Sequence, residues 1–167
     1  DTPIRQRIFT CTPASPSEAR PCAEQIVSRL GERAFRRPLG DDDVAALMSF
    51  YDNGAASGDF ELGVRTALEA MLASPRFVFR FERPLGDVTP GETYRIDGFA
   101  LASRLSYFLW ASPPDDELRR VASDGSLLGD RVLETQVLRM LADPKVDALG
   151  PRFAGQWLRL QDLDKVH

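Results

Sequence analysis

Two clusters of acidic residues have side chains that could bind a metal ion or act in catalysis. Asp41, Asp42 and Asp43 resemble a metal-binding group, and the pair Asp115 and Asp116 has the carboxylates needed for general acid and base work. Each cluster follows a glycine or a proline and opens a helical pattern, where acidic side chains cap the helix and complement its dipole. Consecutive helical residues also point in different directions. We therefore assign no catalytic residue and no metal ligand.

The two cysteines, Cys11 and Cys22, flank a loop that contains three prolines. A disulfide between them would close a loop of about 12 residues, stabilise the fold by about 3 kcal/mol and indicate an oxidising compartment. The alternative is two unrelated thiols. Two cysteines and the distant His167 do not make a four-ligand metal set. We predict the disulfide, at the end of an irregular N-terminal arm over residues 1–21.

Three arginines are candidates for contacts with an anion or a substrate: Arg76, Arg80 and Arg104. Apolar and charged residues alternate over 76–82, which predicts a half-buried strand paired with 93–96 in a hairpin; a helical turn is the alternative. Arg104 lies on an otherwise apolar helix, so it needs a buried acid or an anionic ligand. An internal acid would favour a structural role, and convergence of Arg80 and Arg104 on an open pocket would favour an enzyme.

The elements that must position these residues are helices, because apolar residues recur at helical spacing nearly throughout. Glycines near 54 and 58 end the second helix, and Pro151 should kink the last one or divide it into two short helices. Arginines near the end of the first helix fit its dipole, with an anion-binding patch as the alternative. The predicted helices span about residues 21–37, 41–53, 60–74, 97–110, 115–124, 130–142 and 143–160.

The helix over 97–110 is apolar on most of its circumference and should be largely buried. Ser103, Ser106 and Trp110 form its narrow polar stripe. We expect this stripe, together with Trp157, to be an interaction surface for a partner domain. The alternative for Trp110 is that it closes the end of the core.

Composition limits the class of protein. The chain has 43% hydrophobic and 28% charged residues and a net charge of −4, which suits a globular unit and gives no general attraction to nucleic acid. No apolar run approaches the roughly 18 residues of a membrane span. We predict a mainly α, irregular bundle of six to seven helices with one optional short hairpin. After the arm come a helical subdomain over 22–83, a linker or hairpin over 84–96, and a second helical subdomain over 97–167, truncated at its C-terminus as in a fragment of a larger polypeptide.

A family resemblance rests on five phrases: RAFRRPL (33–39), GDFELGVRTALEAMLASPRFVFR (58–80), YRIDGFALASRLSYFLWASPPDDEL (94–118), VLRMLADP (137–144) and FAGQWLRLQDL (153–163). With these the chain, from about Cys22 onward, resembles two adjoining domains of unknown function in large secreted bacterial proteins of the planctomycete and myxobacterial type. The arm from Cys11 to Cys22 is similar to the two-cysteine lead-in of some members.

The resemblance implies an exported, periplasmic or extracellular, multidomain protein that is often associated with c-type cytochrome modules. The chain has no C-x-x-C-H run, so any haem c would lie in another module. The implied partners are other domains of the same polypeptide or a cytochrome-containing protein.

Two hypotheses follow for the function. The first is a non-catalytic helical scaffold that docks other domains through Trp110 and Trp157. The second is part of an enzyme, oxidative or acting on extracellular polymer, whose pocket is completed by further domains. Its polar contributors would be Arg76, Arg80, Arg104, Asp115 and Asp116.

Overall fold

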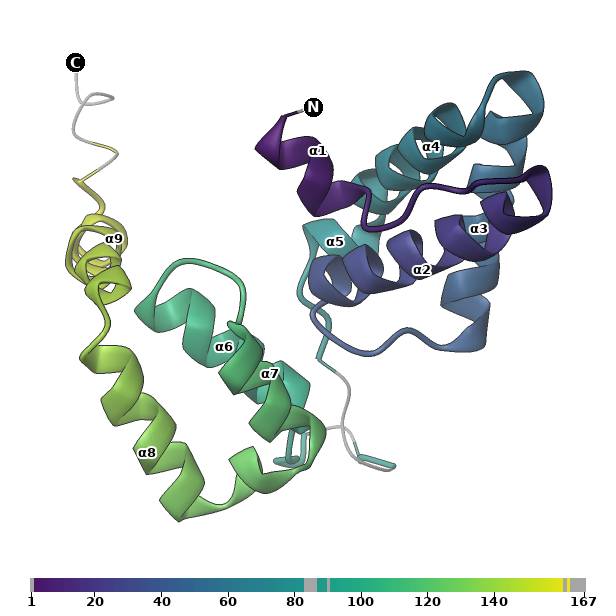
Figure 1. The fold of residues 1–167 in the computed structure, drawn as a ribbon. Coiled ribbons are helices and arrows are strands. Elements are labelled where there is room, and N and C mark those ends of the chain that lie inside the picture. Colours follow the sequence, from purple (N-terminus) through teal and green to yellow (C-terminus); the bar gives the residue numbers. More distant parts are fainter. Residues whose placement is uncertain (1, 83–86, 90, 161, 163–167) are drawn as a thin grey trace. The chain divides into compact units, whose positions relative to one another are not determined.

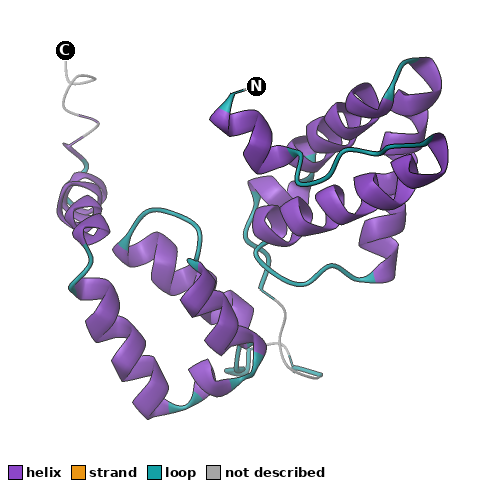
Figure 2. Ribbon diagram, in the orientation of Figure 1, coloured by secondary structure: helices purple, strands orange, loops and turns teal. Residues whose placement is uncertain are grey.

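Helices make up 72% of the structure, a computed structural model that describes residues 2–82, 87–89, 91–160 and 162. Over these residues there are no strands (Figure 2), so the predicted mainly α, irregular bundle is confirmed. The chain divides into two compact units, Asp1–Arg80 and Phe81–His167, and each has its own hydrophobic core.

The first unit packs three long helices around one core (Figure 1). Its fully buried side chains come from all three of them and include Ile26, Val27, Met48, Val64 and Met71. The helices of this unit are α1 (Pro3–Ile8), α2 (Pro16–Phe35), α3 (Asp41–Ser57), α4 (Phe60–Ala73) and the single turn α5 (Pro75–Val78).

The predicted irregular arm is wrong, because α1 and the first turns of α2 lie within it. The sequence carried a signal for the earlier start: Ser15 precedes Pro16, and Glu18 follows at the capping-box spacing. The Glu18 carboxylate accepts a hydrogen bond from the Ala14 amide at 3.0 Å. Pro21 therefore lies inside α2, where its ring removes one helical hydrogen bond without ending the helix.

The predicted disulfide is present, between Cys11 and Cys22. It joins the loop after α1 to α2. Arg29 of α2 makes a second connection, since its guanidinium donates to the carbonyls of Arg7 and Ile8 at 2.6 and 3.1 Å. The short helix α1 is thus fixed to the unit by its C-terminal end.

Glycines allow α3 and α4 to approach closely. The predicted helix end near Gly54 is wrong, because α3 continues to Ser57. A Cβ on Gly54 would lie 2.9 Å from the Leu62 carbonyl, and one on Gly63 would lie 2.7 Å from the Tyr51 ring. The missing side chain at Gly54 serves helix packing here and does not break the helix.

The predicted hairpin is wrong in its first strand, and the helical-turn alternative is correct. Pro75 opens α5 after Ser74, whose hydroxyl accepts from the Arg76 amide at 3.2 Å. The residues from 93 to 95 form no regular element. Residues 83–86 and 90 of the predicted connection lie outside the described residues.

The second unit consists of short helices around a smaller core (Figure 1). Its most deeply buried side chains include Ala102, Leu118, Leu127 and Met140. The last predicted helix is divided, as the proline at 151 indicated. The helices are α6 (Gly98–Leu109), α7 (Asp116–Ser123), the 3-10 turn η1 (Ser126–Leu128), α8 (Asp130–Leu141), the 3-10 turn η2 (Pro144–Ala148) and α9 (Leu149–Trp157).

Four helices begin at an aspartate N-cap. Each cap is an aspartate whose carboxylate accepts from a backbone amide two or three residues later, at 2.7 to 2.9 Å. These caps are Asp59, Asp97, Asp115 and Asp143.

Removal of the disulfide should destabilise the first unit. The double substitution Cys11→Ala and Cys22→Ala frees a loop of about 12 residues in the unfolded chain, and we expect a loss of about 3 kcal/mol in the free energy of unfolding. Denaturant titration followed by hydrogen exchange of the α2 amides measures this loss. Reductant should destabilise the wild type by a similar amount and leave the double variant unchanged. Equal stability of variant and wild type would contradict the prediction.

The contact between α3 and α4 should not tolerate a methyl group. In Gly63→Ala the new Cβ meets the Tyr51 ring and carbonyl, so we expect the first unit to lose about 1–3 kcal/mol despite the better helix propensity of alanine. Gly155→Ala in α9 is the matched control, because its Cβ meets nothing within 4 Å. The control should gain up to about 1 kcal/mol. Denaturation curves of both variants test the pair, and two changes of the same sign would refute it.

Candidate functional site

An aromatic cluster lies exposed on the second unit. The ring of Phe108 on α6 meets that of Phe153 on α9 edge to face at 6.4 Å, and Phe153 stacks on Trp157 at 5.9 Å between ring centroids. Their exposed fractions are 58%, 52% and 73%. We call Phe108, Phe153 and Trp157 the aromatic cluster.

Helical spacing brings the three rings together. Phe153 and Trp157 are four residues apart on α9 and share a face. Phe108 is likewise four residues after Arg104, which is 61% exposed, so both belong to the outer face of α6. The exposure of Phe108 corrects the expectation that the helix over 97–110 is buried on most of its circumference. The spacing of Phe108 from the charged Arg104 on the same helix was the signal for this exposure.

The predicted interaction stripe of α6 faces inward, which is a correction. Ser103, Ser106 and Trp110 are 7%, 0% and 3% exposed. Small serines suit a close helix contact, and the Ser106 hydroxyl is satisfied by donating to the Ser103 carbonyl at 3.2 Å. The alternative, that Trp110 closes the core, is correct. Of the predicted surface only Trp157 is exposed.

Trp110 is enclosed by polar partners as well as by the core. Its indole Nε1 donates to the Met140 carbonyl at 2.9 Å. The Lys145 ammonium lies 4.3 Å from the ring centroid and the Arg139 guanidinium 5.5 Å from it. These cations lie within the distance at which they are attracted to the ring face, so Trp110 joins the end of α6 to α8 and η2.

Asp115 connects the same region to α7. Its carboxylate accepts two hydrogen bonds from Arg139, at 2.7 and 3.1 Å, and one from the Leu118 amide at 2.9 Å. Burial opposes ionisation, but these hydrogen bonds and the charges of Arg139 and Lys145 outweigh it and lower the pKa of Asp115. Its neighbour Asp116 is 77% exposed and pairs with Arg119. The structure therefore uses both carboxylates in ion pairs.

Arg104 has a surface partner. Its guanidinium pairs with both carboxylate oxygens of Glu82, so its partner is an internal acid, the alternative that favours a structural role. The pair is not buried, however, because the Arg104 side chain is 61% exposed and points outward, beside Phe108. Hydrogen bonding to Glu82 also raises the pKa of Arg104. Arg80 is exposed at the end of the first unit, whereas Arg104 belongs to the second.

Arg76 takes part in a buried ionic corner of the first unit. It pairs with Asp43, whose carboxylate is 5% exposed and also accepts from Arg37 at 2.7 Å and from the Gly40 amide at 3.2 Å. Asp43 lies in the first turn of α3, where its carboxylate closes a capping box with the amide of the N-cap Gly40, and it additionally holds α5. Asp41 and Asp42 remain exposed in the first turn of α3.

Arg36 is a structural residue that the sequence interpretation missed. It is 8% exposed and has a left-handed backbone with φ of 60°. Its guanidinium donates to the carbonyls of Ala34, Arg76, Phe77 and Phe79 at 2.9 to 3.2 Å. An arginine that merely complements a helix dipole would stay exposed, and no sequence pattern distinguishes this one from its neighbours.

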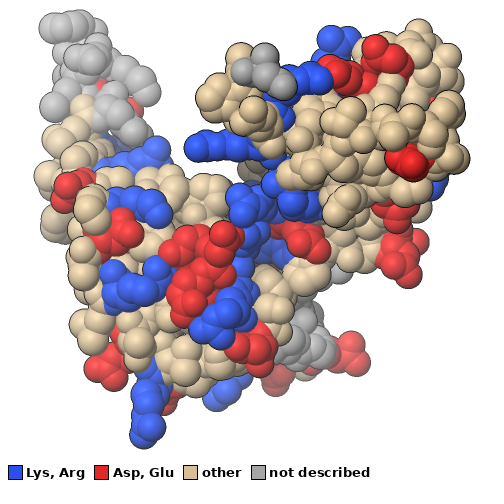
Figure 3. Space-filling model, viewed as in Figure 1, with Lys and Arg blue, Asp and Glu red and all other residues tan. Residues whose placement is uncertain are grey.

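Other classes of site have little support in the described residues. Among them no three or more His, Cys, Asp or Glu side chains gather as metal ligands, and His167 lies outside them. None of the described helices is both long and apolar enough to cross a membrane. On the visible face, acidic and basic side chains are interspersed over each unit (Figure 3), without one large patch of a single sign.

The lowered pKa of Asp115 predicts an acid-sensitive second unit. A group with a lowered folded-state pKa stabilises the fold above its unfolded value of about 3.9, and that stability is lost as the pH falls through the folded pKa. We expect Asp115→Asn to lower the free energy of unfolding at pH 7 by about 1 kcal/mol and to weaken the decline between neutral and low pH. Asp116→Asn is the control and should keep the decline. Thermal unfolding from pH 7 to pH 2 tests this; equal pH profiles for the two variants would contradict it.

Comparison with protein families finds two matches along the chain. Residues 22–82 match the PSD5 family, described as a protein of unknown function (DUF1595), and residues 96–167 match the PSD4 family, a protein of unknown function (DUF1592). Neither the curated proteins nor the solved structures contain a match. The first match begins at Cys22, so α1 and Cys11 precede it. The chain thus carries a PSD5-type domain followed by a PSD4-type domain, the paired domains of unknown function that its sequence resembles.

Proposed function

We propose that this chain is a non-catalytic helical scaffold of a larger exported protein and that its aromatic cluster docks against a further domain of the same polypeptide. The exposure of Phe108, Phe153 and Trp157 is the observation that carries this proposal. Three adjoining rings, each more than half exposed, form an apolar patch of the kind that marks an interaction site.

The surroundings of the cluster support the same function. Leu158 follows directly on Trp157 and is 56% exposed. Aromatic side chains are enriched at the centres of protein interfaces, and tryptophan above all supplies binding energy there. Arg104 beside Phe108 adds a polar rim to the apolar centre.

A domain of the same polypeptide is the favoured occupant. Two domain types already follow one another in this chain, and a covalent connection gives a docking domain a high effective concentration, so a modest apolar patch suffices. A separate cytochrome-containing protein is the alternative occupant. In that case haem c would be held by the partner, since the sequence contains no C-x-x-C-H run.

The disulfide supports export. Cys11 and Cys22 are both oxidised, and disulfides persist in periplasmic and extracellular compartments but are rare in reducing ones. We therefore propose that the parent protein resides in the periplasm or outside the cell.

The enzyme hypothesis finds less support. Of its five polar contributors, Arg76, Arg104, Asp115 and Asp116 are engaged by Asp43, Glu82, Arg139 and Arg119 in that order. The fifth, Arg80, is exposed. None of the five lines the cavity of the first unit. These contacts favour a structural use of the residues.

Tryptophan fluorescence tests the docking proposal, because the chain has two tryptophans. In Trp110→Phe the remaining emission comes from Trp157, which is exposed in this chain. We expect strong acrylamide quenching in residues 1–167 alone and weak quenching, with blue-shifted emission, in the longer polypeptide. The matched control Trp157→Phe leaves the buried Trp110, which should be protected in both.

Two results would overturn the docking proposal. One is equal, strong quenching of Trp157 in the short and the long protein. The other is protection of Trp157 in the long protein that survives Phe108→Ser and Phe153→Ser, because the aromatic cluster would then not be the contact. Protection that appears only when a cytochrome is added would favour the alternative occupant.

A further inference from the structure

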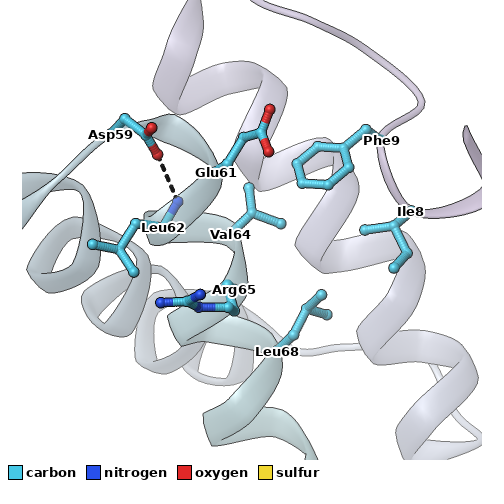
Figure 4. A pocket seen from close by; sticks show the side chains of 8 residues that line it. All are labelled: Ile8, Phe9, Asp59, Glu61, Leu62, Val64, Arg65 and Leu68. Atoms are coloured by element: carbon cyan, nitrogen blue, oxygen red, sulfur yellow. Dashed lines mark hydrogen bonds between the residues drawn. The ribbon is translucent and has the colours of Figure 1, made fainter. Parts of the chain in front are cut away.

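A cavity of about 440 Å³ lies in the first unit, between the end of α1 and the outer side of α4 (Figure 4). Its volume falls in the range of small-molecule sites, about 300–1,000 Å³. It lies wholly within residues 8–68 and is separate from the aromatic cluster. The inference drawn from it goes beyond the proposed function.

One side of the cavity is apolar. Ile8, Phe9 and Leu68 line this side, and the fully buried Val64 lies between it and the opposite wall (Figure 4). Burial of a hydrocarbon or aromatic group against these side chains gives about 25 cal/mol for each Å² of apolar surface removed from water. This side therefore suits the apolar body of a ligand.

Both acids that line the cavity already have partners. The Asp59 carboxylate accepts from the Leu62 amide at 2.9 Å as the N-cap of α4. Glu61 pairs through both oxygens with Arg5, and that hydrogen bonding lowers the pKa of Glu61. The charge of Glu61 is thus compensated by Arg5, and the Asp59 carboxylate is held at the N-terminus of α4, where the helix dipole favours a negative charge.

Arg65 is the cation among the lining residues. Its guanidinium lies on the Leu62 side of α4, whereas Leu68 points toward Ile8 (Figure 4). It pairs with Glu69 at 3.6 Å, and both side chains are more than two-thirds exposed. Such surface pairs contribute little, about 0–1 kcal/mol, so an anionic ligand could replace Glu69 at low cost and with a better-aligned, bidentate contact.

The apolar wall is already in place without a ligand. The disulfide from Cys11 and the Arg29 hydrogen bonds to Ile8 and Arg7 hold the end of α1. The Phe9 ring also contacts Phe60, with 6.2 Å between centroids. A preformed wall lowers the entropic cost of binding.

We propose that this cavity binds a small amphipathic carboxylate, with an aromatic or branched aliphatic body against Ile8, Phe9 and Leu68 and its carboxylate on Arg65. The apolar wall would favour ligands with a hydrophobic body, and the Arg65 guanidinium would favour ligands with a negative charge.

The test compares two probes of the same shape and opposite charge, 4-phenylbutyrate and 4-phenylbutylamine. Residues 1–167, labelled for NMR, are titrated with each probe. We expect the carboxylate to shift the signals of Ile8, Val64 and Leu68 and to bind at least tenfold more tightly than the amine. No shift at these residues up to 10 mM probe, or equal affinity for both probes, would overturn the proposal.

Two variants separate the charge contact from the apolar contact. Arg65→Gln should remove the preference for the carboxylate and retain weak binding of both probes. Leu68→Trp should fill the cavity and abolish binding of both. Arg20→Gln is the matched control, since Arg20 pairs with Asp52 and Glu24 away from the cavity; it should bind as the wild type does. Circular dichroism checks that each variant is folded. Tight carboxylate binding that persists in Arg65→Gln would show that another cation is responsible and would also overturn the assignment.

Discussion

Helix ends are the constraint on which the rest of this structure depends. Each end of an α-helix leaves up to four backbone groups without a helical partner, and a chain built from short helices has many such ends. At N-terminal ends the partners are carboxylates, as in Asp59, Asp97 and Asp115. At C-terminal ends the partners include guanidinium groups. Arg29 donates to a carbonyl in the last turn of α1, and Arg36 donates to carbonyls of α2 and α5. Many of the charged residues that resemble catalytic or binding groups in the sequence serve to satisfy helix ends in this way.

The same residues also connect helices to one another. The Asp43 carboxylate accepts from the Gly40 amide at the start of α3, and the same buried carboxylate pairs with Arg37 and Arg76. Asp115 caps α7 and holds Arg139 of α8, which in turn lies over Trp110. Removal of one partner from a buried ion pair leaves an uncompensated charge, so these corners fix the arrangement of helices within each unit. They leave the surface of each unit to other functions.

Two surfaces remain after the caps and cores are accounted for. The aromatic cluster of the second unit presents apolar rings to solvent, and the cavity of the first unit presents an apolar wall and Arg65. The aromatic cluster depends on Phe153 and Trp157, four residues apart on α9, and the cavity depends on the end of α1 lying beside α4. The two surfaces belong to units with separate cores.

Local chemistry was readable from the sequence: the aspartate caps, the stop at Pro75, the division near Pro151, the mainly α class and the disulfide all depend on neighbouring residues. Only the tertiary structure decided which face of α6 is buried. A helix that is apolar on most sides gives no unique inner face, and small serines at 103 and 106 pack closer than the larger Phe108, which therefore lies outside. The buried role of Arg36 was likewise decided by the tertiary structure, because two of its acceptors, the carbonyls of Arg76 and Phe77, lie some 40 residues further along the chain. Caps and helix stops depend on interactions between residues close together in the sequence, so they can be predicted from it. The choice of the buried helix face depends on contacts that exist only once the helices have packed.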